Sequence, residues 1–116
     1  MFRTFVLAVL AAAPALADPP VIEHVTANGS GGTWRFDVTL SHPDTGWEHY
    51  ADAWRVLDMD GNELGIRILL HPHETEQPFT RSLGGLAIPR DVDTVQIEAR
   101  CLVDGWANAR KTVQLR

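Results

Sequence analysis

The chain has 116 residues, of which 45% are hydrophobic and 22% are charged, and acidic residues exceed basic ones by five. This acidity argues against nucleic acids and anionic membrane surfaces as partners, because both are negatively charged. The single cysteine, Cys101, cannot form a disulfide within the chain, so packing must supply the stability of the fold.

The first 17 residues have the layout of a secretory signal peptide. Arg3 gives a positive start, residues 5–13 form an apolar run, and the small residues of Ala15-Leu16-Ala17 follow Pro14. We therefore expect cleavage after Ala17 and a periplasmic or secreted location in a bacterium. The apolar run is too short for a stable membrane anchor. No cysteine directly follows the cleavage point to carry a lipid, and no later segment predicts a transmembrane span.

Residues 18–116 have the length of one domain, and their apolar pattern has a period of two, which is typical of β-strands. In the stretch 34–40, Trp34, Phe36, Val38 and Leu40 alternate with polar residues, and glycine-containing turns separate such stretches. No stretch has the apolar stripe of an amphipathic helix. We predict seven strands, near 21–28, 32–41, 49–58, 63–70, 79–83, 94–103 and 107–115.

Seven short strands with regular turns indicate an all-β immunoglobulin-like sandwich. The stretch PPVIEHVTANGSGGTWRFDVTL resembles the opening of a fibronectin type III domain, and Trp54 falls on the third strand, where Ig-like folds bury a tryptophan. Cys101 takes the place of the second cysteine of antibody domains, but Phe36 and Val38 stand where the first would lie, and Ala99 replaces the expected tyrosine. The resemblance is therefore to the architecture of small secreted bacterial Ig-like proteins of unassigned function, and it implies no activity.

If the seven strands run alternately up and down, the connections after the second, fourth and sixth strands meet at one end of the sandwich. We call this the histidine-rich end, because four of the five histidines fall there. Loops on a rigid scaffold commonly carry binding residues. The candidate residues of this end are His42, Trp47, Glu48, His49, His71, His73, Glu74, Glu76 and Trp106.

The sharpest hypothesis for this end is a transition-metal site. His71 and His73, two residues apart around Pro72, point the same way if the backbone is extended, and imidazole binds zinc and copper well. His42, His49, Glu74 or Glu76 would complete the ligand set. The alternative is that these histidines are solvated loop residues. Cys101 has the inward parity of its strand, which favours a buried core thiol over a soft metal ligand or an intermolecular disulfide.

Three further side chains at this end have two interpretations. Trp47 and Trp106 either form an exposed binding patch or cover the end of the core. Asp52 shares the parity of Trp54 and is expected to face inward, where a carboxylate needs a partner. Arg81 is the expected partner, and the alternative is that Asp52 orients a histidine of the site.

Catalytic motifs are weakly represented. A triad of Ser82, a histidine and Asp52 can be drawn, but no nucleophile elbow, phosphate loop or zinc-protease motif supports an enzyme. We therefore predict no catalytic residues and a non-catalytic binding module for an unidentified protein or small ligand, with copper or zinc as the candidate metals. The alternative is a structural or accessory protein-interaction domain without a metal site.

Overall fold

A computed structural model describes residues 18–116, and the predicted signal peptide, residues 1–17, lies outside the described residues. The described part of the chain is built of strands, as predicted, but it contains eight of them rather than seven. Within this part no helix is long and apolar enough to span a membrane. The strands are β1 (Val21–Ser30), β2 (Thr33–Ser41), β3 (Ala51–Leu57), β4 (Glu63–Ile68), β5 (Phe79–Ala87), β6 (Thr94–Cys101), β7 (Gly105–Trp106) and β8 (Lys111–Gln114).

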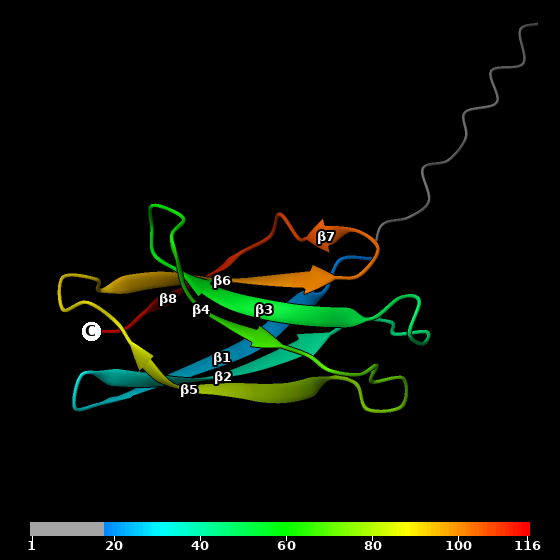
Figure 1. Ribbon diagram of the computed structural model, residues 1–116, viewed down its shortest axis with the longest axis horizontal. Helices are drawn as coiled ribbons and strands as arrows, with labels where there is room; N and C mark the ends of the chain where they lie inside the picture. The colour runs from blue at the N-terminus through cyan, green and yellow to red at the C-terminus, as the bar shows by residue number, and fades with distance from the viewer. Residues whose placement is uncertain (1–17) are drawn as a thin grey trace, which may run out of the picture.

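The strands form two antiparallel sheets (Figure 1). One has the order β1-β2-β5, and the other has the order β4-β3-β6-β7, with β8 also paired to β6. The last predicted strand, 107–115, is shorter than predicted, because its pairing with β6 begins only at Lys111. The eighth strand is β7, which precedes this range and pairs Trp106 with Arg100.

The fifth strand is longer than its sequence suggested. Gly84-Gly85 predicts a connection, but β5 continues through both glycines to Ala87. The pairing with β2 shifts register here, between Trp34 opposite Leu86 and Phe36 opposite Leu83. Gly85 has a φ of 64°, which glycine adopts without strain. The two glycines therefore form a strand irregularity rather than a strand end.

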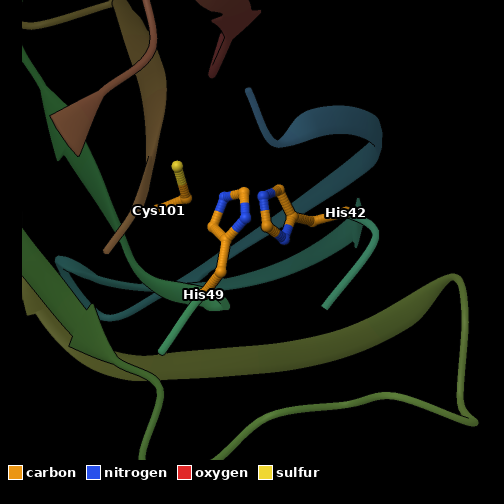
Figure 2. A group of neighbouring side chains, drawn as sticks. All are labelled: His42, His49 and Cys101. Carbon is orange, nitrogen blue, oxygen red and sulfur yellow. The ribbon is translucent and has the colours of Figure 1, made fainter. Parts of the chain in front are cut away.

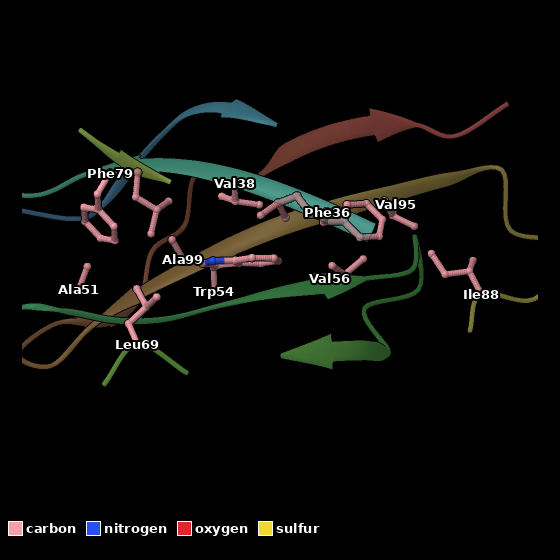
Figure 3. Close-up of a cluster of buried hydrophobic side chains, with 12 residues drawn as sticks. Phe36, Val38, Ala51, Trp54, Val56, Leu69, Phe79, Ile88, Val95 and Ala99 are labelled. Carbon is pink, nitrogen blue, oxygen red and sulfur yellow. The ribbon is translucent and has the colours of Figure 1, made fainter. Parts of the chain in front are cut away.

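The hydrophobic core lies between the two sheets (Figure 3). Alternate residues of each central strand face inward, and the largest fully buried side chain is Trp54 of β3. Burial of each large apolar side chain contributes about 1.5–3 kcal/mol relative to exposure. The main contributors from β2, β5, β3 and β6 are Phe36, Val38, Leu40, Phe79, Trp54, Val56, Val95, Ile97 and Ala99.

The connections β2–β3, β4–β5 and β6–β7 meet at one end of the molecule, which is the histidine-rich end (Figure 1, right). The His73 backbone N–H donates to Asp44 Oδ2 at 2.7 Å, joining the first two connections. The Leu102 N–H donates to the Tyr50 carbonyl at 3.0 Å, joining the first and third. These hydrogen bonds hold side chains from three distant parts of the sequence beside one another.

Candidate functional site

Three potential metal ligands lie together at the histidine-rich end. One ligand atom from each of His42, His49 and Cys101 lies within 4.8 Å of those of the other two. Figure 2 shows the two imidazole rings beside each other, with the Cys101 side chain next to the His49 ring. The ring centroids of His42 and His49 are 4.7 Å apart in an edge-on arrangement. We call these three residues the His₂Cys cluster.

The strand pattern explains why the cluster lies at the end of the core. His42 directly follows β2 and continues the inward-facing series of Val38 and Leu40. Cys101 is the last residue of β6 and continues the inward-facing series of Ile97 and Ala99. His49 comes from the β2–β3 connection, where its backbone bridges to Gly46. The sheets thus place the thiol and one imidazole, and a short turn adds the second imidazole.

A buried carboxylate fixes the orientation of His42. Asp44 Oδ1 lies 2.5 Å from His42 Nδ1, and both side chains are fully buried. The same oxygen accepts a hydrogen bond from the Ala51 N–H at 3.0 Å, while Oδ2 accepts the His73 N–H at 2.7 Å. A carboxylate can only accept at Nδ1, so the neutral His42 ring carries its proton there and leaves the Nε2 lone pair free.

One ring nitrogen of His42 and one of His49 have no hydrogen-bond partner in the described part of the chain. Nε2 of His42 and Nε2 of His49 are both buried, and neither has a hydrogen-bond partner within residues 18–116. A buried polar atom without a partner costs about 1–3 kcal/mol. Three other buried atoms of the described chain also lack partners, Trp54 Nε1, Arg67 Nε and His73 Nδ1, but only the two imidazole atoms of the cluster lie together with a thiol. Two such nitrogen atoms beside a thiol form an arrangement that a metal ion would satisfy.

The Cys101 thiol is buried and interacts with the turn that follows it. It donates to Asp104 Oδ2 at 3.5 Å, and the Asp104 backbone N–H donates to the sulfur at 3.4 Å. Burial raises the pKa of the thiol, and the Asp104 N–H opposes that rise. The thiol is therefore protonated at neutral pH, and binding of a metal would displace its proton.

His71 and His73, the predicted chelating pair, lie outside this cluster. Their ring centroids are 4.5 Å apart. His71 is exposed, whereas His73 is buried and stacks on Phe79 with a centroid distance of 3.9 Å. Arg81 donates to His73 Nε2 at 2.8 Å, so this nitrogen is occupied by a cation rather than free for a metal. His73 instead supports the site through its backbone bond to Asp44.

Trp47 and Trp106, the two predicted binding tryptophans, have different surroundings. Trp47 is 65% exposed at the tip of the β2–β3 connection and packs edge-on against Tyr50. Trp106 is partly buried on the five-stranded sheet, with the Arg55 guanidinium 3.8 Å from its ring centroid. Of the two acidic candidates, Glu74 is exposed and Glu76 forms a 3.4 Å ion pair with Arg81.

Asp52 and Arg81 do not pair as expected. A register shift in the β3–β6 pairing between Ala51 and Ala53 breaks the alternation, so Asp52 does not share the inward direction of Trp54. Asp52 accepts a 3.0 Å hydrogen bond from Arg100, whereas Arg81 contacts His73 and Glu76. The role of orienting a histidine, considered for Asp52, is performed by Asp44.

Sequence reasoning missed Asp44. It correctly predicted a buried thiol at Cys101 but did not group that thiol with His42 and His49. A usable signal was present for both positions. His42 and Cys101 each extend an inward-facing alternation by one residue past the apolar core, at the same end of neighbouring sheets. Asp44 follows His42 at a spacing of two, from which a carboxylate can reach back to the imidazole.

The chain is similar in sequence to a known protein and in fold to a solved structure. No family model matches the chain. A protein of Halomicrobium mukohataei described as a "putative lipoprotein" is 43% identical over 98 residues, which is 84% of this chain and 48% of that protein. The chain thus spans about half the length of this relative.

Among solved structures, a hypothetical protein from Pyrococcus horikoshii OT3 is similar in fold. Its TM-score is 0.55 at 15% sequence identity, and the match covers 84% of this chain and 88% of that one. At this identity the likeness concerns the fold alone. It agrees with an all-β arrangement of two antiparallel sheets as the architecture of the described chain.

Proposed function

We propose that this protein is an extracytoplasmic binding module that holds a transition-metal ion, copper or zinc, in the His₂Cys cluster. The observation that carries the proposal is the pair of buried Nε2 atoms of His42 and His49, which have no hydrogen-bond partner among residues 18–116 and belong to the same cluster as the Cys101 thiol. The proposed role is binding rather than catalysis.

The ligand types suit these metals. Imidazole nitrogen and thiolate sulfur are both ligands of zinc and copper, and two histidines with one cysteine also form the trigonal plane of blue-copper sites. Ligands of a tetrahedral zinc ion lie about 3.3–3.6 Å apart, given bond lengths of about 2.0–2.3 Å. The donors of the cluster lie within 4.8 Å of one another, so small side-chain rotations would bring them to an ion.

Asp44 supports this proposal as an outer partner of the metal site. Metal-binding histidines commonly donate their second N–H to a carboxylate, which fixes the ring and increases the basicity of the ligand nitrogen. The Asp44–His42 contact has this geometry, and two backbone N–H groups hold the carboxylate in place. The cluster therefore resembles a prepared site rather than a chance grouping of side chains.

Two observations support the proposed location. The first 17 residues have the pattern of a secretory signal peptide, and a relative is described as a lipoprotein.

We also infer an immunoglobulin-like sandwich. Pairing of β2 with β5 and of β3 with β6 matches the B–E and C–F neighbours of that fold, whereas β4 pairs with β3 instead of joining the first sheet.

A protein-interaction role is the second candidate. Several large apolar side chains are exposed on the three connections of the histidine-rich end, and exposed apolar clusters often mark contact surfaces. They come from all three connections around the cluster, so a partner would contact the protein beside the metal. These residues are Trp47, Leu70, Leu102 and Val103.

Calorimetric titration of the purified protein with Zn(II) and Cu(II) tests the proposal. We expect a 1:1 complex tighter than about 10 μM, which corresponds to about 7 kcal/mol. His42→Ala and Cys101→Ala should each abolish this binding, whereas the matched control His71→Ala should retain it. Weaker binding in the unmodified protein, or full binding by the Cys101→Ala variant, would exclude the His₂Cys cluster as the site.

A further inference from the structure

A carboxylate lies next to the sulfur of the His₂Cys cluster. Asp104 Oδ2 is 3.5 Å from Cys101 Sγ. A sulfur and an oxygen bound to one tetrahedral zinc ion at about 2.3 and 2.1 Å would be separated by about 3.6 Å. The observed spacing, at which the thiol donates a hydrogen bond to the carboxylate, is therefore close to that of two ligands that share an ion. Asp104 lies outside the group whose ligand atoms are within 4.8 Å of one another, so its side chain would rotate toward the histidines on metal binding.

The hairpin between β6 and β7 brings Asp104 back to Cys101. Cys101 pairs with Gly105, and the three residues between them form the turn. Gly105 has a φ of 74°, which a glycine adopts readily and which closes a turn of this length. The Asp104 N–H also donates to the sulfur at 3.4 Å, so backbone and side chain of this residue both face the thiol.

Resting on the proposed function, we infer that Asp104 supplies an oxygen ligand to the metal bound by His42, His49 and Cys101, and that the site consequently takes a divalent ion in preference to Cu(I). The Asp104 residue is exposed while the other three ligands are buried or partly buried. The histidine nitrogens and the Cys101 sulfur would then bind the metal from the core side, and the Asp104 carboxylate would bind it from the solvent side.

The charges of the ligands favour a divalent ion. Two neutral imidazoles, one thiolate and one carboxylate carry two negative charges, which a divalent cation neutralises. The buried Asp44 carboxylate beside His42 adds a third negative charge, so a divalent ion leaves one charge uncompensated in the site. Cu(I) would leave two negative charges uncompensated and would therefore carry the larger cost of desolvation. In addition, Cu(I) prefers soft sulfur ligands, whereas a carboxylate is a hard ligand that suits Zn(II) or Fe(II) better.

The test compares Co(II), a spectroscopic substitute for Zn(II), with Cu(I) under anaerobic conditions. Asp104→Asn removes the charge with little change of shape, and Asp104→Ala removes the ligand. Glu74→Gln is the matched control, because it neutralises an exposed carboxylate at the same end of the molecule. Chelator competition gives the affinities, and absorption spectra report thiolate-to-Co(II) charge transfer and the intensity of the ligand-field bands.

We expect both Asp104 variants to bind Co(II) about tenfold more weakly or worse. Removing a residue that only hydrogen-bonds to a metal ligand already lowers metal affinity by about that factor. The ligand-field spectrum of these variants should change while the thiolate band persists, and Cu(I) affinity should stay within about threefold of the unmodified protein. Glu74→Gln should alter neither. A Co(II) affinity and spectrum unchanged in both Asp104 variants would overturn the inference and leave the His₂Cys site standing. Absence of a thiolate band in the unmodified protein would instead refute the proposed function itself.

Discussion

At the scale of single residues, Asp44 determines how His42 can act. Its carboxylate lies 2.5 Å from His42 Nδ1 and is itself held by the N–H groups of Ala51 and His73. An asparagine at this position could donate through its amide and hold the wrong imidazole tautomer, in which Nε2 carries the proton. The metal would then have to displace that proton.

We therefore predict that Asp44→Asn weakens Zn(II) binding by about 10–100-fold, the usual effect of changing an outer partner. Calorimetry measures the affinity, and NMR of the metal-free protein reports the tautomer of His42. Asp52→Asn is the control, since Asp52 is bound to Arg100 instead. Unchanged zinc affinity in the Asp44 variant would contradict the orienting role.

At the scale of elements, Glu98 connects neighbouring strands on the five-stranded sheet. It lies directly opposite Arg55 in the β3–β6 register and accepts two hydrogen bonds from its guanidinium, at 3.0 and 2.6 Å. Arg110 donates to its other oxygen at 2.7 Å, although the residue follows β7 rather than belonging to a strand. The Glu98 side chain is only 4% exposed, so the two arginines replace the water that would otherwise solvate its carboxylate.

We predict that Glu98→Gln lowers the free energy of unfolding by about 1–3 kcal/mol, because the amide cannot accept from both arginines and hydrogen bonds to charged groups are stronger than neutral ones. Urea denaturation measures the change. Glu63→Gln is the comparison, since Glu63 makes only a 3.5 Å contact with Arg55 and is more exposed. Equal effects of the two substitutions would contradict the special role of Glu98.

The two sheet edges formed by β4 and β5 approach each other closely at one glycine. A Cβ atom on Gly65 would lie 2.6 Å from Leu86 Cδ1 and 3.1 Å from Leu83 Cδ2. Gly84 has open space at the same position and no positive φ. The two glycines are therefore a matched pair for testing how tightly the sheets pack.

We predict that Gly65→Ala destabilises the protein by about 1–3 kcal/mol through overpacking. Gly84→Ala should be neutral or stabilising by up to about 1 kcal/mol, because it restricts the unfolded chain. Thermal and urea unfolding provide the measurement. Equal stability of the Gly65→Ala and Gly84→Ala variants would contradict the close packing of Gly65 against the leucines of β5.

At the scale of the whole molecule, stability should depend on pH through His73. Burial lowers the pKa of His73, and the neighbouring Arg81 and His71 lower it further, whereas Glu76 and Asp44 act in the opposite direction. The unfolded chain therefore binds a proton on this residue at a higher pH than the folded chain does. It follows that the folded state loses stability as pH falls below about 6.5, the ordinary pKa of histidine.

We predict that the unfolding free energy decreases between about pH 7 and pH 5, and that His73→Gln reduces this decrease. Above the ordinary pKa of histidine both states are neutral at this position, so the contribution of His73 to the pH dependence should vanish. Denaturant unfolding of both proteins across this range tests the prediction. A steeper loss in the variant would show that protonation of His73 favours the folded state.

The sequence predicted the all-β class because period-two alternation depends on local chemistry alone. It also predicted that the three connections would meet, because that follows from the strand order. It could not place Asp52, because the register shift beside it depends on the pairing with β6. The metal hypothesis was built on His71 and His73 because they lie two residues apart in the sequence, whereas folding alone brings His42 to Cys101 across 59 positions.

X-ray absorption spectroscopy of the zinc-loaded protein identifies the ligand atoms of the bound metal. We predict one sulfur neighbour at about 2.3 Å and imidazole scattering from two histidines at about 2.0 Å. In the Cys101→Ala variant the sulfur neighbour should be absent. A zinc ion surrounded only by nitrogen and oxygen in the unmodified protein would contradict the proposed site.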